Sequence, residues 1–158
     1  MATLDPVADD PIAAWRALLL AHSRALRAIE REMEEAGVIS LTWYDVLLEL
    51  SAAPHRRLRM QDLGDRVVLS RSRVSRVVDD LVGAGLVRRD PDPTDGRATL
   101  ATLTAPGRAA LRQAAPVYMR GIERHFTGLL SADERQHVAR ALNKVVRAHE
   151  LIAPPRRR

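Results

Sequence analysis

The 158-residue chain contains no cysteine and, among its 25 basic residues, a single lysine, Lys144. The missing cysteine excludes thiolate metal sites, thiol-based redox sensing and a cysteine nucleophile. The lysine follows no glycine-rich loop, and neither a GxSxG nor an HExxH motif occurs, so common nucleotide-binding, hydrolase and metalloprotease signatures are missing. We therefore expect that the protein is not an enzyme.

Aromatic residues and long apolar runs are also scarce. Two Trp, two Tyr and one Phe leave no stacking platform for single-stranded RNA. No apolar run reaches the length of a signal-peptide core or a membrane span, which predicts a cytoplasmic protein without a membrane partner. The histidines at 125, 137 and 149 have no close partner at ligand spacing, so we expect no metal and no other cofactor.

The composition, 46% hydrophobic and 28% charged, is typical of a globular protein with one domain or two closely packed lobes. The net charge is +5, but the three C-terminal arginines account for much of it, so only the local placement of charge can indicate a polyanion partner. We expect residues 1–10 to be flexible and residues 151–158 to form a disordered basic tail.

Both ends of the chain predict long helices. Residues 11–35 form the first, capped by Asp9 or Asp10 and ended by Gly37. Its apolar seam has the heptad spacing of a helix that packs lengthwise on other helices: Ile12, Trp15, Leu19, His22, Leu26, Ile29 and Met33. Near the C-terminus, Thr104 caps a helix to about residue 129 with a kink at Pro116, and Ser131 with Glu134 begins a last helix to about residue 150. The apolar stripe of that last helix consists of Val138, Leu142, Val145 and Val146.

The central region predicts shorter elements. A helix begins at a Thr42 cap with Asp45 three residues later and ends at Pro54, a short helix covers residues 60–67, and another runs from a Ser70 cap to Gly85. Strands at 86–90 and 98–104 flank a turn-rich loop, "PDPTDGR". Two short helices followed by a hairpin predict a winged helix-turn-helix, in a fold that is mainly α with a small β-hairpin wing.

The helix capped by Ser70 has three Ser and three Arg within residues 70–76, opposite an apolar arc of Val74, Val77, Val78, Leu81 and Val82. Ser and Arg on an exposed helix can bind phosphates and guanine in the major groove. The alternative is a solvated face, and Asp79 and Asp80 could either orient arginines or repel DNA. The hairpin favours DNA, because Arg88, Arg89 and Arg97 add a second basic contact. "RRLR" at 56–59 is either a phosphate contact or a solvated loop.

From residue 41 to 107 the sequence resembles the MarR family of bacterial transcriptional regulators. The resemblance depends on "LTWYDVLLEL", "LSRSRVSRVVDDLVGAGLVRR", "DGRA" at 95–98 and "LTAPGRAAL", and the flanking helices match in length and order. It implies a winged helix-turn-helix lobe at 38–104, a homodimer through N- and C-terminal dimerisation helices at 11–37 and 105–150, and a repressor that a ligand releases from a pseudo-palindromic operator. Family branches that sense oxidants use cysteine, which this chain lacks.

The resemblance also assigns residues. Those expected at double-stranded DNA by this resemblance are Ser70, Arg71, Ser72, Arg73, Ser75, Arg76, Asp95 and Arg97, and the basic hairpin adds Arg88. Arg97 would enter the minor groove, with Asp95 shaping the wing. The alternative function is a winged-helix protein-interaction module with only unspecific nucleic-acid affinity. A homodimer is expected on geometric grounds too, because half-sites about 34 Å apart require two reading heads at a fixed separation.

A small, perhaps aromatic effector is a further expected partner, because the resembled family binds aromatic molecules between its dimerisation helices and winged lobes. The candidates are Trp15, His22, Trp43, Tyr44, Asp45 and Tyr118. For each aromatic residue, ordinary core packing is the alternative, and for His22 the alternatives are a proton switch and an interface histidine.

Overall fold

The computed structural model describes residues 10, 12–67 and 71–152. The expectations for residues 1–9, 68–70 and 153–158, including Ser70 as a cap, Asp9 as a cap and a disordered tail, lie outside the described residues. In the chain's order the elements begin with α1 (Ala13–Glu35), α2 (Leu41–Ala52), a 3₁₀ turn (Pro54–Arg56), β1 (Arg57–Arg59) and α3 (Met60–Arg66). They continue with α4 (Arg71–Gly83), β2 (Val87–Pro91), β3 (Thr99–Leu103), α5 (Ala105–His125), a 3₁₀ turn (Thr127–Leu129) and α6 (Ala132–Ile152).

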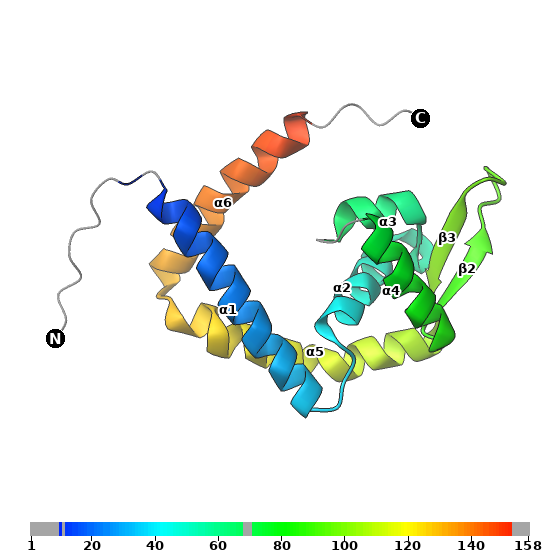
Figure 1. The fold of residues 1–158 in the computed structure, drawn as a ribbon, viewed down its shortest axis with the longest axis horizontal. Helices are drawn as coiled ribbons and strands as arrows, with labels where there is room; N and C mark the ends of the chain where they lie inside the picture. Colours follow the sequence, from blue (N-terminus) through cyan, green and yellow to red (C-terminus); the bar gives the residue numbers. More distant parts are fainter. Residues whose placement is uncertain (1–9, 11, 68–70, 153–158) are drawn as a thin grey trace.

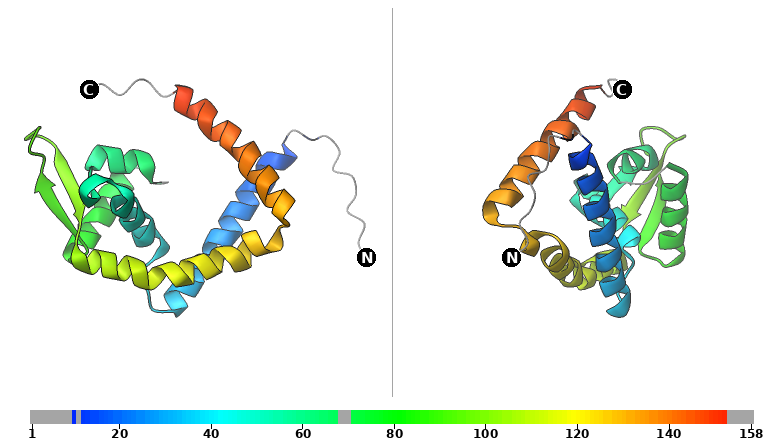
Figure 2. Two further views of the ribbon diagram at one scale, coloured as in Figure 1. Left: turned by 180° about the vertical axis from the view of Figure 1, so that it is seen from behind. Right: turned by 60° about the vertical axis from the view of Figure 1, so that its left-hand side comes forward.

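The long helix α5 connects two regions that lie at its opposite ends (Figure 1). Helices α2, α3 and α4 and the small sheet gather around its N-terminal end and form the winged lobe. Helix α1 crosses the other half of α5, and α6 turns back beside the N-terminal half of α1 (Figure 2). The chain therefore has the predicted architecture, mainly α-helical with a small β wing.

The sheet has three antiparallel strands in the order β1-β3-β2. The hairpin of β2 and β3 confirms the sequence prediction, but "RRLR" forms β1, where Arg57 faces Thr102 and Arg59 faces Leu100. Both sequence interpretations of this segment missed the strand. A segment of three residues with one apolar side chain, Leu58, is too short to show the alternation of apolar and polar residues that predicts a strand. The strand it pairs with, β3, lies more than forty residues later in the chain.

Several helix ends follow the sequence signals. Gly37 and Gly85 adopt the positive φ angles, 65° and 73°, that end α1 and α4. Ser131 N donates to Glu134 Oε2 at 2.7 Å and Glu134 N to Ser131 Oγ at 3.3 Å, which confirms the capping box. The start of α1 differs from the prediction, since the N-cap position is Ile12, without a side-chain cap, and Asp10 Oδ1 instead accepts from Ile12 N at 2.9 Å before the helix begins.

Other ends differ from the prediction. The cap of α2 is Ser40, whose Oγ accepts from Trp43 N, and Thr42 lies inside the helix, because the serine is the residue in extended conformation. Helix α5 begins at the predicted Thr104 cap but ends at His125 rather than near residue 129, since Phe126 leaves helical backbone angles. The helix continues through Pro116.

The core of the winged lobe is closed within one chain. Leu47, Leu50, Leu63, Val78 and Leu81 are fully buried, and they come from α2, α3 and α4. The predicted apolar arc of α4 is buried except for Val82, which is 36% exposed because it lies at the edge of the arc. No described helix is long and apolar enough to cross a membrane.

The heptad seam of α1 divides into two halves. Ile29 and Met33, at its C-terminal end, are buried against the rest of the chain. Trp15 is 59% exposed and Leu19 48% exposed, although they continue the same stripe. Val145 and Val146 of α6 are likewise exposed. Within one chain, the N-terminal half of α1 and the C-terminal half of α6 therefore leave apolar side chains exposed to solvent.

Candidate nucleic-acid interface

Helix α4 presents a polar ridge on the side opposite its buried face. Its valines pack into the lobe, whereas Ser72, Arg73 and Arg76 are exposed and Ser75 is half-buried. This arrangement follows from the spacing, since residues three and four apart share one face of a helix. Ser70 and the side chain of Arg71, the remaining members of the predicted ridge, lie outside the described residues.

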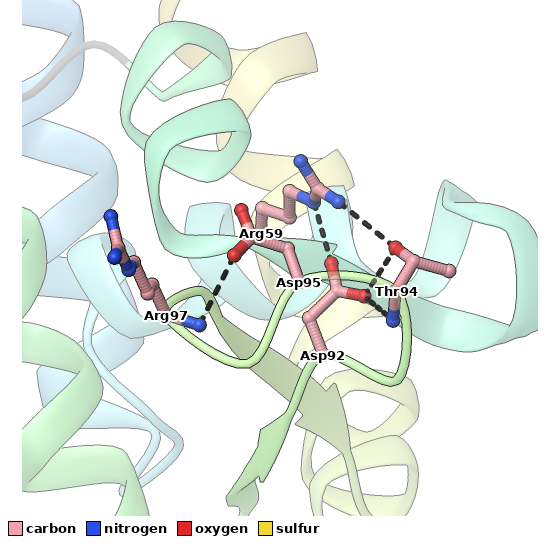
Figure 3. A network of polar contacts seen from close by, with 5 residues as sticks. All are labelled: Arg59, Asp92, Thr94, Asp95 and Arg97. Atoms are coloured by element: carbon pink, nitrogen blue, oxygen red, sulfur yellow. Dashed lines mark hydrogen bonds and ion pairs between the residues drawn. The ribbon is translucent and has the colours of Figure 1, made fainter.

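The wing loop between β2 and β3 is shaped by two aspartates (Figure 3). Asp95 Oδ1 accepts from Arg97 N at 3.1 Å, and Ala98 N donates to Asp95 O at 2.9 Å, so Asp95 organises the backbone that carries Arg97. Asp92 N donates to Ala98 O at 3.0 Å and closes the base of the loop. Arg97 is exposed at the tip.

The second aspartate, Asp92, is buried and has three short hydrogen bonds. Its Oδ1 accepts from Thr94 N at 2.8 Å and from Thr94 Oγ1 at 2.7 Å, and its Oδ2 accepts from Arg59 Nε at 2.6 Å. The two bonds from Thr94 and then the guanidinium of Arg59 lower the pKa of Asp92 to about 2. The carboxylate is therefore charged at neutral pH, and its partners keep the buried charge satisfied.

A groove of about 610 Å³ separates the ridge of α4 from the wing. Three arginines and several neutral side chains surround it, and its lining is Arg59, Met60, Gln61, Ser75, Arg89, Asp95, Arg97, Ala98 and Thr99. Ser75 and Arg97, both predicted from the sequence, therefore lie at one feature although they are far apart in the chain. An elongated polyanion could lie in this groove with the ridge on one side and the wing on the other.

The two neighbouring arginines of β2 have different surroundings. Arg89 lines the groove, where its Nη2 donates to Asp79 Oδ1 of α4 at 2.7 Å, so Asp79 is paired with an arginine of the hairpin. Arg88, the one predicted at DNA, does not line the groove. Its Nε and Nη2 bind the two carboxylate oxygens of Asp90 at 2.7 and 3.0 Å, and this lowers the pKa of Asp90. Successive strand residues point to opposite faces, which explains the difference.

Sequence reasoning missed Asp92 and Thr94 as parts of this site. It counted Arg89 among the basic contacts of the hairpin and left Arg59 in a segment that was either a phosphate contact or a solvated loop, but it predicted neither ion pair, Arg89 with Asp79 or Arg59 with Asp92. The stretch "DPT" at 92–94 carried a usable signal, because Asp side chains favour hydrogen bonds to the backbone two residues later. The contact of Arg59 with Asp92 carried none, since 33 residues separate them in the chain.

The effector candidates do not form one cavity. The rings of Tyr44 and Tyr118 are in contact at a centroid distance of 4.5 Å and a tilt of 40°, and burial raises the pKa of both hydroxyls and of the half-buried Asp45 beside them. His22 and Tyr118 line a different feature, an apolar groove of about 620 Å³ between α1, α5 and α6. Trp43 packs against the lobe core, and the exposed Trp15 lines neither groove. Among the described residues no three His, Asp or Glu side chains gather as metal ligands.

Known proteins resemble this chain in sequence and in structure. Residues 39–98 match the model of the MarR family. The chain is 35% identical over 86 residues to YkoM of Bacillus subtilis, described as an uncharacterized HTH-type transcriptional regulator. That match covers 54% of this chain and 55% of YkoM, so it spans about half the length of the curated relative.

Two solved structures from Streptomyces coelicolor extend the likeness to almost the whole chain. AbsC, a MarR family transcriptional regulator, superposes with a TM-score of 0.80 at 28% identity, covering 92% of this chain and 97% of AbsC. Sco3205, a MarR family regulator solved in complex with DNA, has a TM-score of 0.81 at 26% identity, covering 96% of this chain and 94% of Sco3205. Residues 39–98 thus match the MarR family in sequence, and almost the whole chain, with its ridge, wing and flanking helices, has the fold of MarR family transcriptional regulators.

Proposed function

We propose that this protein is a sequence-specific regulator of transcription that binds double-stranded DNA in the cytoplasm and catalyses no reaction. The observation that supports this best is the joint placement of the α4 ridge and the wing arginine on the two sides of one groove. A helix of this size fits the major groove of B-DNA, and the adjacent wing then meets the neighbouring minor groove. The DNA complex of the similar Sco3205 supports the same assignment.

Each predicted residue has a role in this proposal. Arg73 and Arg76 reach base edges or phosphates in the major groove, where arginine binds guanine in bidentate fashion, and the serines of the ridge donate to phosphates. Ser70 and Arg71 are proposed to meet the same major groove. Arg97 enters the minor groove, and Asp95 holds its backbone. Arg88 is proposed as an outer phosphate contact, and Arg89 as a contact inside the groove.

We propose a homodimer as the functional form, with a second copy of this chain on the exposed apolar faces of α1 and α6. Trp15, Leu19, Val145 and Val146 are large apolar side chains at least half exposed or nearly so, and the apolar groove of about 620 Å³ lies between the same helices. Exposed apolar surface of this extent indicates a protein partner. Two-fold symmetry then places two α4 ridges on one duplex and requires a pseudo-palindromic operator.

Repression that an effector relieves is the second part of the proposal. The tyrosine pair and Asp45 lie between α2 of the lobe and α5, where a bound aromatic molecule would bias the lobe positions. Equilibrium dialysis with benzoate and phenol as probes, compared between the unmodified protein and Tyr118→Ala, tests this part. Binding that Tyr118→Ala leaves unchanged argues against the site.

The decisive experiment on function is the selection of bound duplexes from a random pool. We expect a site with dyad symmetry whose half-sites lie about one helical turn, roughly 10 base pairs, apart. A bound pool without sequence enrichment would instead support the alternative, a winged-helix protein-interaction module with only unspecific nucleic-acid affinity.

A further inference from the structure

The wing projects beyond the strand that supports it. The ladder of β1 and β3 ends where Arg59 faces Leu100, whereas β2 and β3 continue to the pair of Pro91 and Thr99. Residues 92–98 therefore lie past the last paired residue of β1, and a two-stranded ribbon by itself is marginally stable. The position of Arg97 depends on what holds this loop to the lobe.

The side chain of Arg59 extends from the end of β1 to this loop. Its Nε donates to Asp92 Oδ2 at 2.6 Å and its Nη2 to Thr94 Oγ1 at 3.2 Å, so the planar guanidinium contacts two residues of the loop at once (Figure 3). Arg59 is also the residue immediately before α3. We call the contacts among Arg59, Asp92 and Thr94 the wing bridge; it ties the first helix of the helix-turn-helix to the base of the wing.

The acceptor end of the wing bridge is well determined. Asp92 is only 7% exposed, and both its carboxylate oxygens are occupied by short hydrogen bonds. Charge-assisted bonds to a buried carboxylate have a narrow geometry, and a guanidinium that binds two acceptors has little freedom to turn. Arg59 is therefore held in place before any DNA arrives, and part of its charge is already neutralised by Asp92.

We propose that Arg59 is a positioning residue for DNA binding, which acts through Asp92 and Thr94 to hold the wing, and with it Arg97, at a set distance from α4. This inference rests on the proposed function. The two sides of the groove are lined by Ser75 of α4 and Arg97 of the wing, and Arg59 lies in the same lining. The width of the groove between α4 and the wing, where a phosphodiester strand would lie, is thus set by a contact within the protein.

The competing role, a direct phosphate contact by Arg59, predicts different results. A phosphate contact needs the positive charge and gains from the loss of Asp92, which competes for it. A positioning contact needs the two-point geometry and fails when either partner is lost. Arg59→Lys separates the roles, because lysine keeps the charge as a compact ammonium but loses the planar fork.

The first experiment measures the affinity of the full-length protein for a selected duplex. We expect Arg59→Gln, Arg59→Lys and Asp92→Asn each to weaken binding by about tenfold, and the double variant Arg59→Gln/Asp92→Asn to be no weaker than either single variant. In an Arg97→Ala background Arg59→Gln should change the affinity by less than about twofold. Arg112→Gln, an equal loss of charge at an exposed site on α5, is the control and should bind as the unmodified protein does.

Three outcomes would overturn the proposal. They are near-normal binding by Arg59→Lys, tighter binding by Asp92→Asn, or, in the Arg97→Ala background, the same loss of affinity from Arg59→Gln as in the unmodified protein. Each of them assigns Arg59 to a phosphate.

The second experiment needs no DNA and follows amide hydrogen exchange in the free protein. The amides of Asp92, Thr94, Arg97 and Ala98 donate hydrogen bonds within the loop. We expect Arg59→Gln to speed their exchange by about threefold or more while Ala101, in the centre of the sheet, keeps its rate. Unchanged loop exchange would overturn the wing bridge. If the unmodified protein selects no duplex, the proposed function fails, and this experiment still decides whether the bridge holds the wing.

Discussion

The winged lobe and the far end of the molecule, formed by α6 and the N-terminal half of α1, differ in how far their apolar side chains are buried. In the lobe, α2, α3, α4 and the sheet bury most of their apolar side chains, with Leu48 and Val82 as exposed exceptions, and the outer face of α4 is polar and basic. At the far end, α1 and α6 leave Trp15, Leu19, Val145 and Val146 exposed. The helices of both regions are amphipathic, so the difference lies in how many neighbours one chain supplies.

This difference teaches which region is stable by itself. The core of the lobe is formed by residues of one chain. We therefore expect the stability of the lobe to be independent of protein concentration. If a second copy covers the apolar faces of α1 and α6, as proposed, the stability of that end should depend on association. In the proposed function, the lobe that contacts DNA is thus complete within one chain, whereas the spacing between two lobes depends on the dimer contact.

The largest effect, on dimerisation, should come from placing charge on the exposed apolar face of α1. Trp15→Glu/Leu19→Glu introduces four carboxylates into a two-fold interface and should raise the dimer dissociation constant by about 1000-fold, since an unpaired buried charge costs several kcal/mol. Sedimentation velocity measures the change, and operator affinity should fall with it. These substitutions are a cleaner test than deletion of residues 1–35, which would also remove Ile29 and Met33 from the core.

Leu48→Glu is the matched control for this pair. Leu48 is 42% exposed on α2, close to the 48% of Leu19, but lies in the closed lobe. It should leave the protein dimeric. A double variant that stays dimeric with full operator affinity would remove the distinction between the two regions.

The second effect tests the closed core. Leu47 is fully buried, and Leu47→Ala should lower the free energy of unfolding by about 3 kcal/mol. Urea denaturation at two protein concentrations should give the same loss for Leu47→Ala, whereas Leu19→Ala should destabilise the protein more when it is dilute. Equal concentration dependence of the two variants would contradict the comparison.

The third effect concerns the outer face of the lobe. Arg76→Ala should weaken specific binding by about 1–3 kcal/mol if Arg76 reads a base, and Arg97→Ala should lower the salt slope of binding by about one unit. Fluorescence anisotropy over a range of salt concentrations measures both. If neither variant changes the affinity for a selected duplex, the DNA contacts lie elsewhere.

The smallest effect should come from the pair of Asp79 and Arg89. Asp79→Asn removes a negative charge from the groove side of α4 and releases Arg89, so binding to any duplex should tighten by about threefold. Asp80→Asn is the control, because Asp80 is also exposed on α4 but does not bind Arg89. Weaker binding by Asp79→Asn would show instead that Asp79 aims Arg89 at the DNA.

Local signals in the chain predicted much of the lobe. The alternation of Ser and Arg with valines defined the two faces of α4, and glycines 37 and 85 marked helix ends that the structure confirms. The cap of α2 was misplaced by two residues because Thr42 and Ser40 are both good caps, and the backbone conformation selects between them. Strand β1 was missed because it exists only through its pairing with β3.

The sequence by itself determined which faces are apolar and which are basic, because side-chain order along a helix decides this before any packing occurs. Only the tertiary structure decided which apolar faces find partners within one chain and which arginines are already bound. Arg59, Arg88 and Arg89 look alike in the sequence, yet the first binds Asp92 and Thr94 of the wing loop, the second pairs with Asp90 on its own strand, and the third lines the groove beside Asp79. The physical reason is that pairing depends on distances between residues far apart in the chain, and only folding sets those distances.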